Sequence, residues 1–88
     1  MIPFKLIVQH PDGKTDDIGK KVTWPALPQK GERVMISDCF LYVDYVMHHI
    51  DRSSCGIEVH CKVDILKPDE ADSCFDFLKT EEGFSSRW

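Results

Sequence analysis

Length and composition place the chain among small folded domains. It has 88 residues, of which 42% are hydrophobic and 30% are charged, so we expect one modest core rather than a disordered segment. No apolar run approaches the roughly 20 residues that a membrane span needs, and the N-terminus lacks the pattern of a signal peptide. We therefore expect a cytoplasmic protein, with no membrane partner and with reduced cysteines.

The net charge of −4 is unevenly distributed. Residues 1–68 carry nine basic and nine acidic side chains, whereas residues 69–88 carry six acidic and two basic ones. The excess negative charge therefore lies in the C-terminal segment. Because counterion release needs concentrated positive charge, a neutral body with an acidic tail predicts no direct binding of nucleic acid.

Two strands are expected before a proline-rich loop. Residues 4–9 alternate in polarity and are followed by Asp12 and Gly13, a pair typical of hairpin turns. Apolar side chains recur at even positions over residues 18–24, which predicts a second strand near an edge. Residues 25–31 contain two prolines and a glycine, which exclude a central strand and favour a shaped loop.

Three further strands are expected after this loop. Residues 32–37 alternate and predict a short strand. Residues 40–50 give the longest candidate, but the apolar phase changes along it, and a β-bulge near Asp44 and Tyr45 would reconcile the two phases. Residues 57–65 alternate without interruption, which is the clearest strand pattern in the chain.

The hairpin formed by the last two strands has a predicted register. If Ile50 pairs with Ile57, then His48 lies beside Val59 on the core face. We interpret His48 as a core histidine held by a backbone partner, in preference to a pH switch.

A helical pattern follows near the C-terminus. Ala71, Cys74, Phe75 and Leu78 fall at positions i, i+3, i+4 and i+7, which is one apolar stripe of a helix. Gly83 can end this helix. The sequence therefore predicts one short C-terminal helix.

Together these elements predict a mainly β fold. We expect a small five-stranded SH3-like barrel or a curled antiparallel sheet with one short C-terminal helix. Residues 1–66 are predicted to form the barrel domain, and residues 67–88 an acidic helix and tail packed on it. The edge of the strand over residues 18–24 offers a route to a homodimer.

Several short motifs carry a resemblance to known proteins. They are Trp24-Pro25-Ala26-Leu27-Pro28, Lys30-Gly31-Glu32-Arg33-Val34, Tyr42-Val43, and Val46 with His48. Over residues 1–66 this pattern resembles small uncharacterised bacterial and phage or mobile-element proteins with SH3-like barrels. The resemblance implies a fold class and a bacterial or phage setting, and it implies no activity.

Four cysteines and four histidines raise the question of a metal site. The close ligand pairs of structural zinc sites are missing from the sequence, so we interpret the cysteines as buried thiols and expect no cofactor. The alternative is a metal or thiol site made by Cys39, Cys61 and His48. No pattern of nucleophile, base and orienting acid is evident, so we expect no catalytic residues and no enzyme.

Two segments carry side chains suited to anchoring a partner. In the proline-rich loop these are Trp24 and Leu27, and in the tail they are Phe77, Phe84 and Trp88. The favoured interpretation of the tail is that its apolar stripe covers the open end of the barrel, because a small core needs every apolar side chain. Binding of a partner by the tail is the alternative.

These observations support one leading hypothesis and two alternatives. The leading one is a non-enzymatic interaction or accessory module of a bacterium, phage or mobile element, which binds an unknown protein through the proline-rich loop or the acidic tail. The alternatives are a small metal-binding or thiol-based domain, and an acidic mimic that acts on a nucleic-acid-binding protein.

Overall fold

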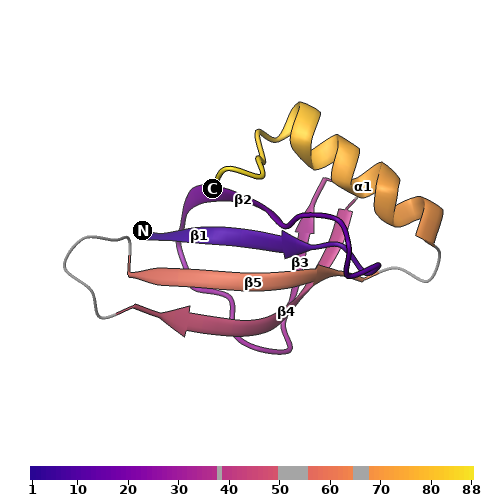
Figure 1. Cartoon of the computed structure of the whole chain (residues 1–88). Coiled ribbons are helices and arrows are strands. Elements are labelled where there is room, and N and C mark those ends of the chain that lie inside the picture. Colours follow the sequence, from indigo (N-terminus) through magenta and orange to yellow (C-terminus); the bar gives the residue numbers. More distant parts are fainter. Residues whose placement is uncertain (38, 50–55, 65–67) are drawn as a thin grey trace.

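The computed structural model describes residues 1–37, 39–49, 56–64 and 68–88. Within these ranges, five strands are followed by one helix (Figure 1). They are β1 (Ile2–Gln9), β2 (Ile18–Trp24), β3 (Arg33–Ile36), β4 (Cys39–His48), β5 (Ile57–Val63) and α1 (Pro68–Glu81). Each expected strand and the expected helix is present, with small differences at the ends.

The strands form one sheet in the order β2-β1-β5-β4-β3, curled into a half-barrel. Neighbouring strands pair antiparallel except β1 and β5, which run parallel at the centre of the sheet. The predicted mainly β class, with five strands and one short C-terminal helix, is confirmed. The parallel pair makes the sheet mixed instead of wholly antiparallel.

A β-bulge bends β4, as the change of apolar phase predicted. The register between β4 and β5 shifts between Val43, which pairs with Cys61, and Tyr45, which pairs with His60. Asp44 is therefore the extra residue of β4. A bulge increases the local twist, and this one allows Val43 and Val46 to face the same side of the curled sheet.

The predicted place of His48 in the core is wrong. Val59, the expected partner of His48, pairs instead with Val46. His48 pairs with Ile57, two residues closer to the hairpin loop, and its side chain is exposed. A shift of two residues keeps a side chain on the same face of a strand. His48 is thus still aligned with Val46, but it lies past the end of the core. Ile50, the expected partner of Ile57, lies outside the described residues.

One hydrophobic core joins the concave face of the sheet to α1. Its strand residues come from alternate positions, as expected for side chains of one sheet face. They are Phe4, Leu6, Val8, Ile18, Val34, Cys39, Leu41, Val43, Val59, Cys61 and Val63. The helix contributes Phe75 and Leu78, which confirms the predicted apolar stripe. Figure 1 shows α1 lying along one side of the strands, with the tail returning towards β2.

Two contacts fix the helix relative to the sheet. His10, at the end of β1, places Nε2 at 2.7 Å from the Asp72 carboxylate, and its ring lies edge-on to Phe75 at 4.9 Å. Beyond the helix, Gly83 has a φ of 77°, and the Phe84 N–H donates to the Leu78 carbonyl at 3.0 Å. Because glycine adopts this left-handed conformation without steric cost, the chain can turn back and bury Phe84.

The tail occupies part of the outer edge of β2. Gly19 and Ser85 exchange two backbone hydrogen bonds, with N···O distances of 2.9 and 3.1 Å. The sheet order confirms that β2 is an edge strand. The predicted homodimer through this edge stays a prediction, and it would have to form beside the paired tail.

Candidate binding site

A groove lies where the proline-rich loop passes between the two edge strands. Its volume is about 310 Å³. The residues that line it are Trp24, Ala26, Leu27, Pro28, Glu32, Arg33, Val34 and Met35. Trp24 and Leu27, two of the five partner-binding residues predicted from sequence, therefore lie in the same groove.

The loop that forms this groove is held by hydrogen bonds at its C-terminal end. The Gly31 N–H donates to the Val43 carbonyl at 2.9 Å, and Glu32 accepts from the Gln29 N–H at 2.7 Å. At the other end, the Trp24 ring lies edge-on to Phe4, with ring centroids 5.3 Å apart. Such constraints lower the entropy that the loop would lose on binding.

Beside the groove, β3 and β4 each present an exposed apolar side chain. Met35 is 65% exposed and lies opposite Phe40, which is 51% exposed, on the face of the sheet away from the core. In the part of the chain that the structure describes, β3 pairs only with β4. Met35 was not among the partner-binding residues predicted from the sequence, although the inward alternation of Val34 and Ile36 places it outward.

The remaining predicted anchors differ in their exposure. Phe84 is only 4% exposed and belongs to the core, so its prediction as a partner anchor is wrong. The turn at Gly83 is the physical reason, because it directs the tail back to the sheet. Phe77 is partly buried against the core, whereas Trp88 is 39% exposed at the C-terminus.

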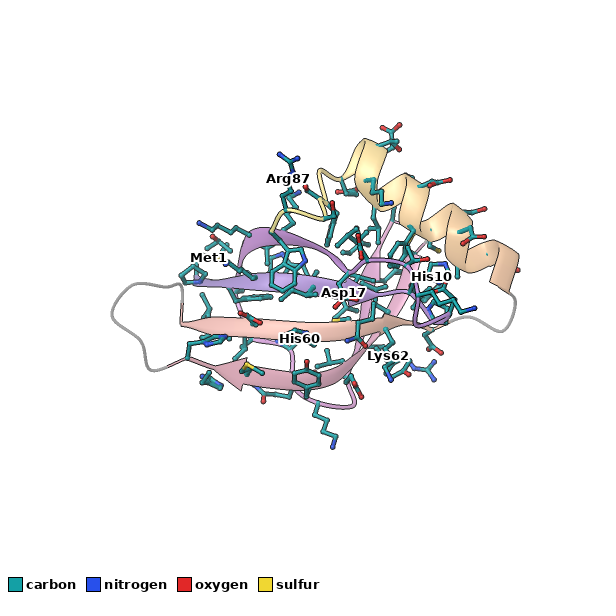
Figure 2. The ribbon with its side chains drawn as sticks, in the orientation of Figure 1. Met1, His10, Asp17, His60, Lys62 and Arg87 are labelled. Atoms are coloured by element: carbon teal, nitrogen blue, oxygen red, sulfur yellow. The ribbon has the colours of Figure 1, made fainter. Side chains whose placement is uncertain are left out.

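A polar cluster lies on the face of the sheet away from the core, around His60 on β5 (Figure 2). The Glu58 carboxylate lies 2.8 Å from Nε2 of both His49 and His60. A carboxylate only accepts, so both nitrogens donate. His60 also stacks on Tyr45, with centroids 4.4 Å apart, and its Nδ1 has no hydrogen-bond partner among the described residues.

Two opposing effects set the ionisation of Glu58. Desolvation by burial raises its pKa, but hydrogen bonds from His60 and His49, together with their charges, outweigh burial and lower the pKa below its usual 4.5. The cluster thus holds a carboxylate in its ionised form. Its two hydrogen bonds connect Glu58 to His60 on β5 and to His49, which directly follows β4.

The alternative metal site does not assemble. Cys39 and Cys61 are buried in the core, whereas His48 is exposed at the end of β4. Over residues 1–37, 39–49, 56–64 and 68–88, no group of three or more His, Cys, Asp or Glu side chains is placed to hold a metal ion. These positions therefore give no support to a site made by the three predicted ligands.

Cys61 is expected to resist alkylation in the folded protein. Its side chain is fully buried, and burial raises the pKa of its thiol to about 12. Because the thiolate is the reactive form, iodoacetamide at mildly alkaline pH should modify the partly exposed Cys74 well before Cys61. Peptide mass spectrometry reads the order, and denaturant should abolish the difference. Equal rates in the native protein would contradict this placement.

Comparisons of the chain with protein-family models, with curated proteins and with solved structures gave no significant match. The resemblance to small SH3-like bacterial and phage proteins therefore stays a prediction. In the described ranges, no helix combines the length and the apolar character needed to cross a membrane.

Proposed function

We propose that the chain is a non-enzymatic interaction module that binds an extended apolar segment of a partner protein in the groove between the proline-rich loop and β3. The observation that carries this proposal is the convergence of Trp24, Leu27 and the highly exposed Met35 on one groove beside a strand edge. The bacterial or phage setting rests on the resemblance alone.

The chemistry of the groove favours an extended peptide. Alternate residues of an edge strand direct their backbone N–H and C=O groups away from the sheet, where an added strand can pair with them. The side chains of Trp24, Leu27 and Met35 then offer apolar contacts to alternate residues of that peptide. Glu32 and Arg33 supply a polar rim, which is the usual surround of an apolar contact patch.

Of the two alternatives, neither has comparable support. The thiol and metal hypothesis would need buried Cys39 and Cys61 to act with exposed His48. The acidic-mimic hypothesis would use the exposed carboxylates of α1, one of which, that of Asp72, is already paired with His10.

Selection from a displayed peptide library tests the proposal. We expect the wild-type chain to select peptides with apolar residues at alternate positions. The substitution Met35→Glu should weaken their binding at least tenfold, about 1.4 kcal/mol, because it places a charge where the peptide excludes water. Fluorescence polarisation measures the dissociation constants.

Thr23→Glu is the matched control, since Thr23 is exposed, lies next to Trp24 and does not line the groove. It should leave the affinity within a factor of two or so of the wild type. Peptides that bind wild type and Met35→Glu equally would exclude the groove as their site. Leu27→Ala gives a second test that introduces no charge.

A further inference from the structure

A second cavity straddles the edge of β2 where the tail pairs with it. Its volume is about 400 Å³, within the usual range for sites of small ligands, roughly 300–1,000 Å³. The residues that line it are Lys5, Gly19, Lys20, Lys21, Gly83, Ser85, Arg87 and Trp88. Four of these eight have cationic side chains and none has an acidic side chain, in a chain whose net charge is −4.

The four cations of this cavity form no ion pair with the described residues. Within those residues, the ion pairs of lysine and arginine are Arg33 with Asp64 and Lys62 with Asp44, both elsewhere on the sheet. Lys5 is the cross-strand partner of Lys21 on β2 and of Glu58 on β5, so a like charge lies on one side of it and a carboxylate on the other. Like charges directly opposite on a sheet are destabilising, and an anion between them would relieve the repulsion.

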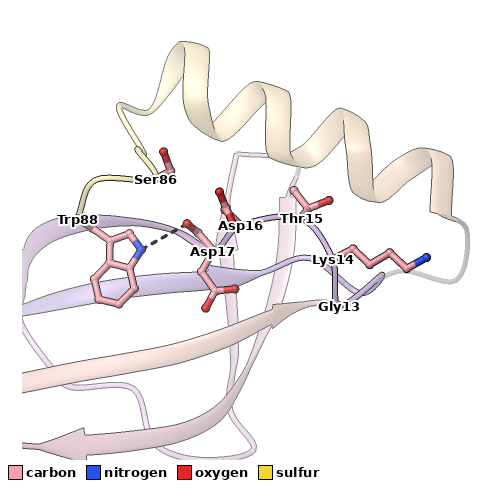
Figure 3. A pocket seen from close by; sticks show the side chains of 7 residues that line it. All are labelled: Gly13, Lys14, Thr15, Asp16, Asp17, Ser86 and Trp88. Carbon is pink, nitrogen blue, oxygen red and sulfur yellow. Dashed lines mark hydrogen bonds between the residues drawn. The ribbon is translucent and has the colours of Figure 1, made fainter.

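An aromatic ring forms another wall of the same cavity. The Trp88 indole packs so closely on Gly19 that a Cβ at position 19 would lie 2.6 Å from its Cγ. The indole N–H donates to the Asp17 carbonyl at 3.4 Å, which Figure 3 shows as a dashed line. The ring is thus held in a defined orientation while 39% of the residue stays exposed.

Carboxylates lie on another side of this ring. Asp16 and Asp17 line a separate open hollow with Lys14 and Trp88 (Figure 3). An anionic group would therefore be favoured on the side of Trp88 that carries Lys5, Lys21 and Arg87. Among the described residues, the acidic side chains of α1, which dominate the net charge, do not line this cavity.

We propose that this cavity binds a nucleotide unit, with its phosphate among the four cations and its base against the Trp88 indole. A phosphate matches clustered Lys and Arg, and a base can stack on any exposed aromatic ring. A free nucleotide and a single-stranded nucleic acid share this chemistry. The inference goes beyond the proposed peptide groove, and it uses none of the groove's lining residues.

Two probes separate the sources of the ligand. Adenosine monophosphate is followed through the Trp88 indole N–H resonance, and a short fluorescein-labelled oligothymidylate through its anisotropy. Saturable binding of both supports the nucleotide unit; binding of the mononucleotide alone identifies a free nucleotide, and binding of the oligonucleotide alone identifies a strand. Binding of neither overturns the proposal.

Variants that remove positive charge test whether the ligand binds in this cavity. The double substitution Lys21→Gln and Arg87→Gln should weaken binding at least tenfold. For the oligonucleotide, the logarithm of the association constant should also depend less steeply on the logarithm of the salt concentration. The magnitude of that slope should fall by about 0.7 for each phosphate that the variant no longer neutralises. Both side chains are exposed and neither makes an ion pair with the described residues, so the fold should persist. The matched control is Lys14→Gln with Lys30→Gln, which removes the same charge outside the cavity.

A separate variant tests the ring. Trp88→Ala should weaken base binding at least fivefold, and Trp88→Phe should restore part of the affinity. An equally large effect in the Lys14 and Lys30 control, or equally tight binding of polyglutamate, would overturn the proposal, because either result indicates a general attraction of anions. Met35→Glu should leave nucleotide binding unchanged, which separates this inference from the peptide groove.

Discussion

Replacing Leu78 by alanine is expected to lower the free energy of unfolding by about 2–5 kcal/mol. Leu78 is fully buried, and it joins α1 to the core formed by all five strands. The substitution removes apolar contacts and leaves a cavity that the surrounding strands can only partly fill. Since small domains are stable by only about 5–15 kcal/mol, the loss would be a large part of the total.

Chemical denaturation followed by circular dichroism measures this effect. Asp76→Ala is the matched control, because Asp76 is exposed on the same helix and its substitution should change stability by less than about 0.5 kcal/mol. A cost below 1 kcal/mol or so for Leu78→Ala would show that α1 is not an integral part of the core.

The substitution Glu58→Gln is expected to cost about 1–3 kcal/mol near neutral pH. The carboxylate of Glu58 is 16% exposed and accepts hydrogen bonds from two histidines, whereas an amide has only one acceptor oxygen for them. Its NH₂ group would instead face a histidine N–H. The pair of strands β4 and β5 would therefore exchange a charge-assisted hydrogen bond for a repulsive approach of two donors.

The pH dependence of this difference follows from the lowered pKa of Glu58. A carboxyl group whose pKa is depressed by folding stabilises the folded state above its unfolded pKa, near 4.5, and loses that contribution as the pH falls through its folded pKa. The gap between wild type and Glu58→Gln should thus be full above pH 4.5 and close at lower pH. The control Glu81→Gln, on the exposed end of α1, should show no comparable gap.

Periodicity predicted most of the fold because each element buries one face. The alternation over residues 57–63 and the helical stripe that ends at Leu78 both arise because apolar side chains recur on the buried face of an element. Apolar periodicity therefore predicts the type of element and its buried face. The bulge of β4 was also predictable, since the apolar phase changes at Asp44. The parallel pairing of β1 with β5 was not, because two strands distant in sequence carry no local sign of their relative direction.

The register of the β4–β5 hairpin could not be predicted from the apolar pattern. A shift of two residues leaves every side chain on its own face, so the apolar pattern cannot distinguish the two registers. His48 was therefore assigned to the core, although the structure leaves it exposed at the strand end. Phe84 was predicted to be available to a partner, although the structure buries it. The turn at Gly83 that directs it into the core leaves no periodic pattern in the sequence.

The candidate sites were predictable only in part. Trp24 and Leu27 were identified by their place in a proline-rich loop, but the contribution of Met35 required the fold of β3 beside that loop. Lys5 and Arg87 are at opposite ends of the sequence and meet only because the tail returns to β2. Net charge, summed along the chain, cannot reveal such a local concentration of cations.

The most direct test of the proposed function is to map a selected peptide on the isotope-labelled protein by nuclear magnetic resonance. We expect the largest changes at the backbone amides of Arg33 and Met35 on β3 and at the Trp24 indole, with amides of β1 and β5 little affected. Such a map would place the peptide along the edge of β3. Changes concentrated instead on α1, with the Trp24 indole unmoved, would contradict the groove as the binding site.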